Sequence, residues 1–158
     1  MGPAPSWRLA YKPLMEDEFC LVCRRDDPLA YPETVAWSVF AEHPFVAMSP
    51  ASSVRTMTDA AFLQSGLAIK QLYECSHLAT AGGLVAAGLG ITALPRLAFA
   101  ILQEGLAARI LSEPTLKRSV GMVTRAGEPL TRAGQNFLSA IEAEARLVVR
   151  RQKTSAGH

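Results

Sequence analysis

The segment from Tyr73 to Pro95, YECSHLATAGGLVAAGLGITALP, constrains the fold of this chain more than any other. It predicts a strand, a glycine-rich apolar helix and a short second strand. Ser76 is the predicted N-cap, and the apolar positions share one helical face: Leu78, Leu84, Val85 and Leu89. Gly82, Gly83 and Gly88 each weaken a helix by about 1 kcal/mol relative to alanine, so we expect close approach to a strand or ligand to compensate. Such a unit builds one wall of a ligand cleft.

Strands and helices alternate along the rest of the chain. The predicted extended segments are Glu18–Arg24, Phe45–Met48, Ile69–Glu74, Ile91–Leu94, Ala108–Leu111 and Ser119–Arg125. The predicted helices are Pro32–Phe40, one capped by Ser52 or Ser53 and running to about Gln64, Leu97–Gln103, and Leu130–Val149. Gly66 is the expected C-terminal stop of the second helix. The alternation argues for a parallel or mixed sheet covered on both faces, an α/β fold.

Ser49 to Ser53 form a serine-rich loop between a buried strand and a helix N-terminus. Free backbone N–H groups and the positive end of the helix dipole attract anions at such a place. Ligands of open α/β sheets bind beyond the carboxyl ends of strands, where this loop should lie. A second candidate is the helix start around Ser76, Ala79 and Thr80, which would face the loop across a cleft. The alternative is that one serine only caps its helix while the others face solvent.

Three segments resemble the effector-binding domain of LysR-type transcriptional regulators, and they occur in the chain order expected for that family. The resemblance covers roughly residues 8 to 145. They are LVAAGLGITALPRLAFAIL, PLMEDEFCLVCRRDDPLA from Pro13 to Ala30, and FAEHPFVAMSPASSVRTMTDAAFLQSGL from Phe40 to Leu67. The first is similar to the family's signature, the second to its inter-lobe strand and turn, and the third to its strand, serine/threonine loop and helix. Asp27 stands where the family usually has histidine, so no role is carried over to that residue.

The resemblance implies a two-lobe, type II periplasmic-binding-protein-like fold, with lobe two complete and lobe one truncated. Residues 1–24 would be a remnant of lobe one and the inter-lobe strand, 25–118 lobe two, 119–150 a return to lobe one, and 151–158 a disordered tail. The family's helix-turn-helix domain and the first half of lobe one are not recognisable. We therefore expect a C-terminal piece of a longer regulator.

The resemblance also implies a ligand-sensing role without enzymatic activity. A small organic anion, such as a carboxylate, would bind between lobes and modulate transcription through the absent DNA-binding domain. The implied contacts are Ser49, Pro50, Ser52, Ser53, Ala79, Thr80 and Thr124. We expect a homodimer or higher oligomer and no cofactor. The alternative is an interaction or oligomerisation fragment with no working effector site, because strand 119–125 and the helix from Leu130 would expose apolar surface.

Charge and hydropathy exclude several other classes. Sixteen basic and fourteen acidic residues give a net charge of +2, without the basic stripe that DNA binding requires. The one basic cluster, Arg146 to Lys153, is typical of a solvated helix end. No apolar run reaches the roughly 20 residues of a membrane span, and the N-terminus has no secretory signal, which favours the cytoplasm.

Three further chemistries have only weak support. GGLVAAGLG, from Gly82 to Gly90, lacks the GxGxxG spacing of a dinucleotide site. Cys20 and Cys23 point to opposite faces of a strand, which disfavours a shared metal or disulfide, and no histidine pair has metal spacing. A cysteine hydrolase using Cys75 and His77 is conceivable, but no orienting carboxylate or oxyanion donor can be assigned.

Overall fold

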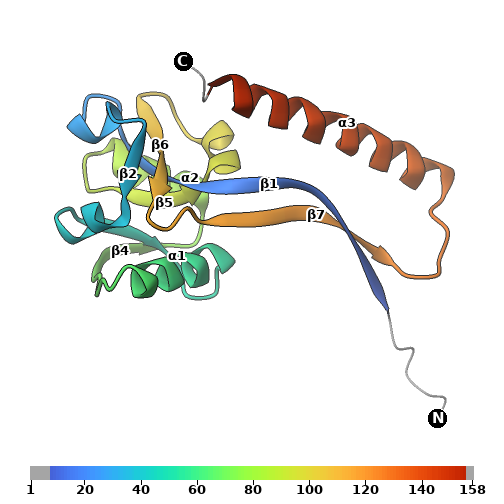
Figure 1. The fold of residues 1–158 in the computed structure, drawn as a ribbon, viewed down its shortest axis with the longest axis horizontal. Helices are drawn as coiled ribbons and strands as arrows, with labels where there is room; N and C mark the ends of the chain where they lie inside the picture. The colour runs from blue at the N-terminus through green and yellow to red at the C-terminus, as the bar shows by residue number, and fades with distance from the viewer. Residues whose placement is uncertain (1–7, 156–158) are drawn as a thin grey trace, which may run out of the picture. The chain divides into compact units, whose positions relative to one another are not determined.

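The computed structural model describes residues 8–155, and Figure 1 shows its elements in chain order. The strands are β1 (Leu9–Arg24), β2 (Thr34–Ala36), β3 (Phe45–Met48), β4 (Gln71–Cys75), β5 (Thr92–Pro95), β6 (Leu106–Ser112) and β7 (Lys117–Arg125). The α-helices are α1 (Ser53–Gln64), α2 (Leu78–Ala86) and α3 (Arg132–Ser155). Short 3-10 helices are η1 (Pro28–Ala30), η2 (Trp37–Ala41) and η3 (Arg96–Ile101). Within residues 8–155, no helix is both long and apolar enough to cross a membrane.

The strands form a mixed sheet, as expected for an α/β fold. Its order is β2-β6-β1-β5, with β7 also paired to β1; β1 is antiparallel to β5 and β6, whereas β2 and β6 are parallel. A second pair, β3 and β4, is parallel. An isolated parallel bridge between Phe45 and Ile91 links β3 to the residue that precedes β5. The parallel β3–β4 pair places the ends of both strands at one edge.

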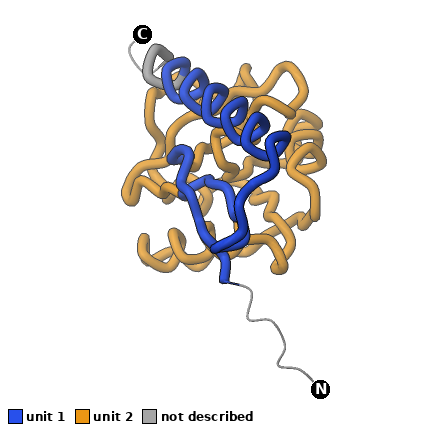
Figure 2. Tube along the Cα trace, turned by 90° about the vertical axis from the view of Figure 1, so that its right-hand side faces the viewer, with its two compact units in different colours: residues 1–16, 119–158 blue, residues 17–118 orange. Residues whose placement is uncertain are grey.

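The chain divides into two compact units, coloured separately in Figure 2. Unit 2 is Asp17–Arg118, and unit 1 comprises Met1–Glu16 and Ser119–His158. The division therefore falls inside β1 and inside β7, between residues 16 and 17 and between 118 and 119. The lobe boundaries expected from the resemblance, at residues 24/25 and 118/119, stay a prediction.

An aromatic cluster lies in the core of unit 2. Trp37, Phe40, Phe45 and Phe62 pack with ring centroids 5.2 to 5.9 Å apart, mostly edge to face. The indole N–H of Trp37 donates to the carbonyl of Pro114 at 2.8 Å, so the buried ring has no unpaired donor. Aromatic pairs in this geometry contribute about 0.5–1.5 kcal/mol beyond area burial. The cluster holds η2, β3 and α1 together.

The elements with strong local signals are confirmed. The predicted strand at Phe45–Met48 is β3, and all four of its residues are buried. The helix expected to begin after Ser52 or Ser53 is α1, with Ser52 as its N-cap. Gly66 has φ +67° just beyond the C-terminus, a conformation that favours glycine and ends a helix.

Two predicted helices are wrong in type or extent. Pro32–Phe40 is not one helix: its centre is strand β2, which pairs in parallel with β6, and only η2 follows it. Leu97–Gln103 is replaced by η3, a 3-10 helix that ends at Ile101. The pairing of β2 joins residues more than seventy positions apart, and no local pattern contains that information.

Two glycines are required by close packing. A Cβ on Gly82 in α2 would lie 2.8 Å from the Leu102 side chain, so close approach does accompany this helix glycine. At Gly90, with φ +151°, a Cβ would lie 2.2 Å from the carbonyl oxygen of Pro44. Gly83 has open space around it, and the expected packing benefit is absent there.

Unit 1 contains the first part of β1, most of β7, and α3. The backbone of Ala126 donates to the carbonyl of Arg8 at 2.7 Å, and the Tyr11 and Ser119 hydroxyls are 2.7 Å apart. Helix α3 ends at Ser155, past the expected start of a disordered tail at residue 151, because its hydrogen-bonded turns continue through the basic cluster. Residues 156–158 of that tail lie outside the described residues.

Candidate functional site

Two loops of unit 2 leave the same edge of the β3–β4 pair. Met48 and Cys75 are partners at the ends of these parallel strands. The backbone N–H of Ser49 donates to the carbonyl of Cys75 at 2.9 Å, which joins the serine loop to the end of β4. Helix α1 begins at Ser53 and α2 at Leu78, so both helix N-termini follow this edge directly.

The serines of the first loop divide into two roles. Ser52 is the N-cap: its hydroxyl accepts from the N–H of Val54 at 3.2 Å, and its own N–H donates to the carbonyl of Ser49 at 2.9 Å. The hydroxyls of Ser49 and Ser53 make no hydrogen bond to another residue within 8–155. Ser49 is half-buried, whereas Pro50 and Ser53 are exposed. The loop therefore offers two uncommitted hydroxyls beside a capped helix.

The start of α2 is one residue later than the sequence predicts. The N-cap is His77, with extended backbone, and its side chain makes no capping hydrogen bond. The carbonyl of His77 accepts from Ala81 at 3.1 Å, so Ser76 lies outside the helix and the predicted Ser76 cap is wrong. By helix geometry the N–H groups of Leu78, Ala79 and Thr80 have no intrahelical acceptor. Ala79 and Thr80 are exposed, which leaves these donors available to a ligand.

The shared edge is favourable for an anion. Each helix N-terminus is equivalent to roughly half a positive charge. The two helix N-termini that follow this edge supply backbone N–H donors, which do not titrate. Glu74 precedes Cys75 on β4 and brings a negative charge close to this edge. The guanidinium of Arg55 pairs with its carboxylate.

Arg55 is a structural residue of this site that sequence reasoning missed. Its Nε donates to both carboxylate oxygens of Asp59, at 2.8 and 2.9 Å, and its Nη1 donates to the Met48 carbonyl at 3.2 Å. Nη1 also lies 3.5 Å from the Glu74 carboxylate. Only 14% of the Arg55 side chain is exposed. Arg55 thus ties α1 to the ends of both strands. Its spacing from Asp59 could have revealed the ion pair but not the two strand contacts.

The thiols of unit 2 are poor nucleophiles. Burial raises the pKa of Cys20 to about 12 and that of Cys23 to about 11. Burial also raises the pKa of Cys75, with a further contribution from Glu74, although the N–H of His77 acts in the opposite direction. The Cys75 thiol is 3.7 Å from the carbonyl of Ala47, to which it donates. All three thiols are therefore protonated near neutral pH, which disfavours the Cys75–His77 hydrolase reading.

The remaining predicted contact, Thr124, belongs to β7 in unit 1 and is half-buried. Its part in a shared site stays a prediction. A polar concavity of unit 2 lies at the other end of α2 and is lined by Arg24, Arg25, Asp26, Ala86, Glu104 and Gly105. Arg24 and Asp26 form an ion pair within it, so its charges largely neutralise one another. Among residues 8–155, no cluster of histidine, cysteine and carboxylate side chains could hold a metal ion.

Comparison with known proteins finds relatives by sequence and by structure. The chain is 33% identical over 132 residues to the HTH-type transcriptional regulator YbhD of Escherichia coli (strain K12), which covers 83% of this chain and 42% of that protein. The chain thus spans about two fifths of the length of this curated relative. The regulatory domain of Synechocystis CcmR, in complex with 2-PG, superposes with TM-score 0.74 and 21% identity, over 91% of this chain and 70% of that one.

The effector binding domain of QuiR, in complex with shikimate, has TM-score 0.69 and 19% identity, over 87% of this chain and 66% of that one. At this level of identity the two solved domains establish the fold, which is the periplasmic-binding-protein-like α/β fold. The family model of the LysR substrate binding domain matches residues 1–146. The chain therefore belongs to the LysR substrate binding domain family.

Proposed function

We propose that this chain senses a small organic anion at the edge that follows β3 and β4, as part of a LysR-type transcriptional regulator. The observation that supports the proposal is that α1 and α2 both begin shortly after the paired ends of β3 and β4, which the Ser49–Cys75 hydrogen bond joins. The related CcmR and QuiR domains hold 2-PG and shikimate, and shikimate is a carboxylate. An anion is the ligand that converging N–H groups favour.

The proposed contacts differ in what they supply. Ser49 and Ser53 donate their uncommitted hydroxyls, whereas the hydroxyl of Ser52 already caps α1. Ala79 and Thr80 donate backbone N–H groups from the uncapped first turn of α2. Pro50 shapes the exposed turn of the first loop, and Thr124 is kept as a contact from unit 1. The ligand charge is met by backbone dipoles, because the Arg55 guanidinium is already paired with Asp59 and Glu74.

Regulation would follow from a difference in the affinity of the ligand for two conformations of the chain. A ligand shifts a conformational equilibrium only as far as its affinities for the two states differ. We expect a homodimer or higher oligomer whose assembly on DNA responds to the bound anion. DNA contact would come from a helix-turn-helix domain of the kind that the relative's name describes.

Titration calorimetry with acetate, benzoate, shikimate and inorganic phosphate tests the anion site. Ser53→Ala removes one hydroxyl and should weaken binding about tenfold, as expected for a hydrogen bond to a charged group. Ser53→Pro removes the backbone N–H as well and should weaken binding further. Proline is well tolerated here, because Ser53 is the first residue of α1 and Ser52 before it is extended.

Ser38→Ala is the matched control, because Ser38 is an exposed serine on η2, away from the strand ends. It should bind the anions like the unaltered chain. Absence of saturable binding for every anion would contradict the proposal, as would equal losses in the Ser38 and Ser53 variants.

A second candidate function is an interaction fragment without a working effector site. It is favoured by the low burial in unit 1, because Ala145 is the only buried hydrophobic residue among the described residues of that unit. Unit 1 also exposes large apolar side chains: Leu9, Tyr11, Val123, Phe137 and Leu147. Normal anion binding by the chain would argue against this candidate.

A further inference from the structure

Three charged side chains next to the edge of β3 and β4 carry a net negative charge. Arg55, in the first turn of α1, donates from Nε to both carboxylate oxygens of Asp59, at 2.8 and 2.9 Å. Its Nη1 lies 3.5 Å from the carboxylate of Glu74. This group has one positive and two negative charges, which leave a net charge of −1. The guanidinium is therefore committed to carboxylates of the chain and has no charge left over for a ligand.

Glu74 is the member of this group that lies closest to the strand ends. It directly precedes Cys75, the last residue of β4, whose carbonyl accepts from the N–H of Ser49 at 2.9 Å. The Nη1 atom of Arg55 that contacts the Glu74 carboxylate also donates to the carbonyl of Met48, at the end of β3, at 3.2 Å. The Glu74 carboxylate therefore lies beside the edge that the serine loop and α2 follow.

The donors at this edge are sufficient for one negative charge of a ligand. Each of the two helix N-termini is equivalent to roughly half a positive charge, so together they balance about one anionic group. The free energy that an ion loses on leaving water rises with the square of its charge. A second anionic group would therefore need a cationic partner, but the charge that it meets beside the strand ends is the carboxylate of Glu74.

We propose that Glu74 determines the ligand class of the anion site, by restricting it to ligands with a single negative charge. The inference rests on the proposed function, because it concerns the same edge of unit 2. The ligand class is a monocarboxylate whose remaining groups are uncharged. Dicarboxylates and phosphate dianions bind more weakly, because the Coulomb repulsion from Glu74 is twice as large for a dianion as for a monoanion at the same distance.

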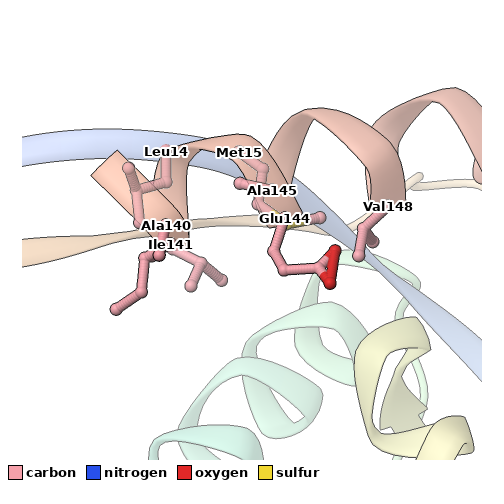
Figure 3. A pocket seen from close by; sticks show the side chains of 8 residues that line it. Leu14, Met15, Ala140, Ile141, Glu144, Ala145 and Val148 are labelled. Carbon is pink, nitrogen blue, oxygen red and sulfur yellow. The ribbon is translucent and has the colours of Figure 1, made fainter. Parts of the chain in front are cut away.

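An apolar groove of unit 1 is a different place where an aromatic acid would find apolar surface. It has a volume of about 340 Å³, and its lining residues are apolar except for Glu144 of α3, shown in Figure 3. A carboxylate at this position repels an anionic ligand. Glu144 is also exposed and lies on a helix, so Glu144→Gln removes the same charge as Glu74→Gln without touching the strand ends. It is the matched control.

Titration calorimetry of the full chain with benzoate and phthalate tests the inference, at low ionic strength and at about pH 8 to keep histidine side chains neutral. The two ligands share one ring, and phthalate has a second carboxylate. The unaltered chain should bind benzoate about tenfold more tightly than phthalate. Glu74→Gln should strengthen benzoate binding about threefold and phthalate binding about tenfold, which narrows the difference to about threefold. Added salt should reduce both gains, because the Glu74 side chain is 43% exposed and is screened.

The ratio of the two dissociation constants separates charge from structure. A change that only disturbed the site would shift both constants by the same factor, and Glu144→Gln should leave both unchanged. Saturable binding with equal affinity for benzoate and phthalate overturns the inference but not the anion site. So does an unchanged ratio in Glu74→Gln, or an equal shift of the ratio in Glu144→Gln. Absence of saturable binding for both ligands, in the chain and in the Glu74 variant, contradicts the proposed function and this inference together.

Discussion

The two units of this chain bury their apolar side chains to very different extents. Every buried hydrophobic residue among those described, apart from Ala145, belongs to unit 2. Unit 2 closes its own core with strands on both sides of β1 and with α1 and α2. Unit 1 has an amphipathic helix of 24 residues and two paired strand segments, but little that is buried between them. A helix can thus be well formed although little of its surface is buried.

Truncation of a large apolar side chain should show the largest difference between the units in the free energy of unfolding that is lost. Trp37→Ala in unit 2 removes a fully buried ring and a hydrogen bond to Pro114 and should lower the free energy of unfolding by about 4 kcal/mol. Phe137→Ala in unit 1 should change it by less than about 0.5 kcal/mol. Urea denaturation of the chain and its two variants gives both values. Equal losses would mean that unit 1 has a core of its own.

Removal of an ion pair should show a smaller difference between the two units in the stability that is lost. Asp17 is fully buried and accepts from Leu97 N–H at 3.0 Å and from Arg118 at 2.9 and 3.1 Å. Asp17→Asn keeps the shape but removes the charge, and should cost about 2 kcal/mol because Arg118 is 29% exposed and partly solvated. Glu142→Gln, which breaks the exposed pair with Lys12, should cost less than about 1 kcal/mol.

The same urea measurements give these two values. A larger loss for Glu142→Gln than for Asp17→Asn would contradict the comparison, because it would place the more important pair in unit 1.

Alkaline pH should produce the smallest effect, and it arises in unit 2. The pKa of Cys20 is raised by burial from 9.0 to about 12, so its contribution to stability is complete below pH 9. As the pH rises from 9 to 10 the unfolded chain ionises first, and the free energy of unfolding should fall by about 1 kcal/mol over that unit. Cys20→Ala should flatten this slope, measured by urea denaturation across that range. An unchanged slope would show that Cys20 ionises equally in both states.

Local patterns were sufficient for the elements around the candidate site. Ser52 and Gly66 mark the ends of α1, and the continuous apolar run at Phe45–Met48 is β3. The shared edge of the two loops also follows from consecutive parallel strands. The start of α2 was missed by one residue, because the preference of serine for N-caps is a tendency and His77 takes the position without a side-chain bond.

Other features depend on partners far away in the chain. Strand β2 exists because Thr34 to Ala36 pair with β6, and no periodicity near Pro32 contains that partner. The contacts of Arg55 with Met48 and Glu74 require β3 and β4 to be neighbours first. The same is true of Gly90, whose place against the Pro44 carbonyl is visible only in the folded chain.

The sequence alone determined the family resemblance, the alternation of strands and helices, and the polar loop that precedes α1, because these depend on neighbours within a few positions. Tertiary structure decided where burial is complete and where it is not. Periodicity shows that α3 has apolar residues, but only the folded chain shows which of its faces is packed, since burial is a property of the surrounding atoms.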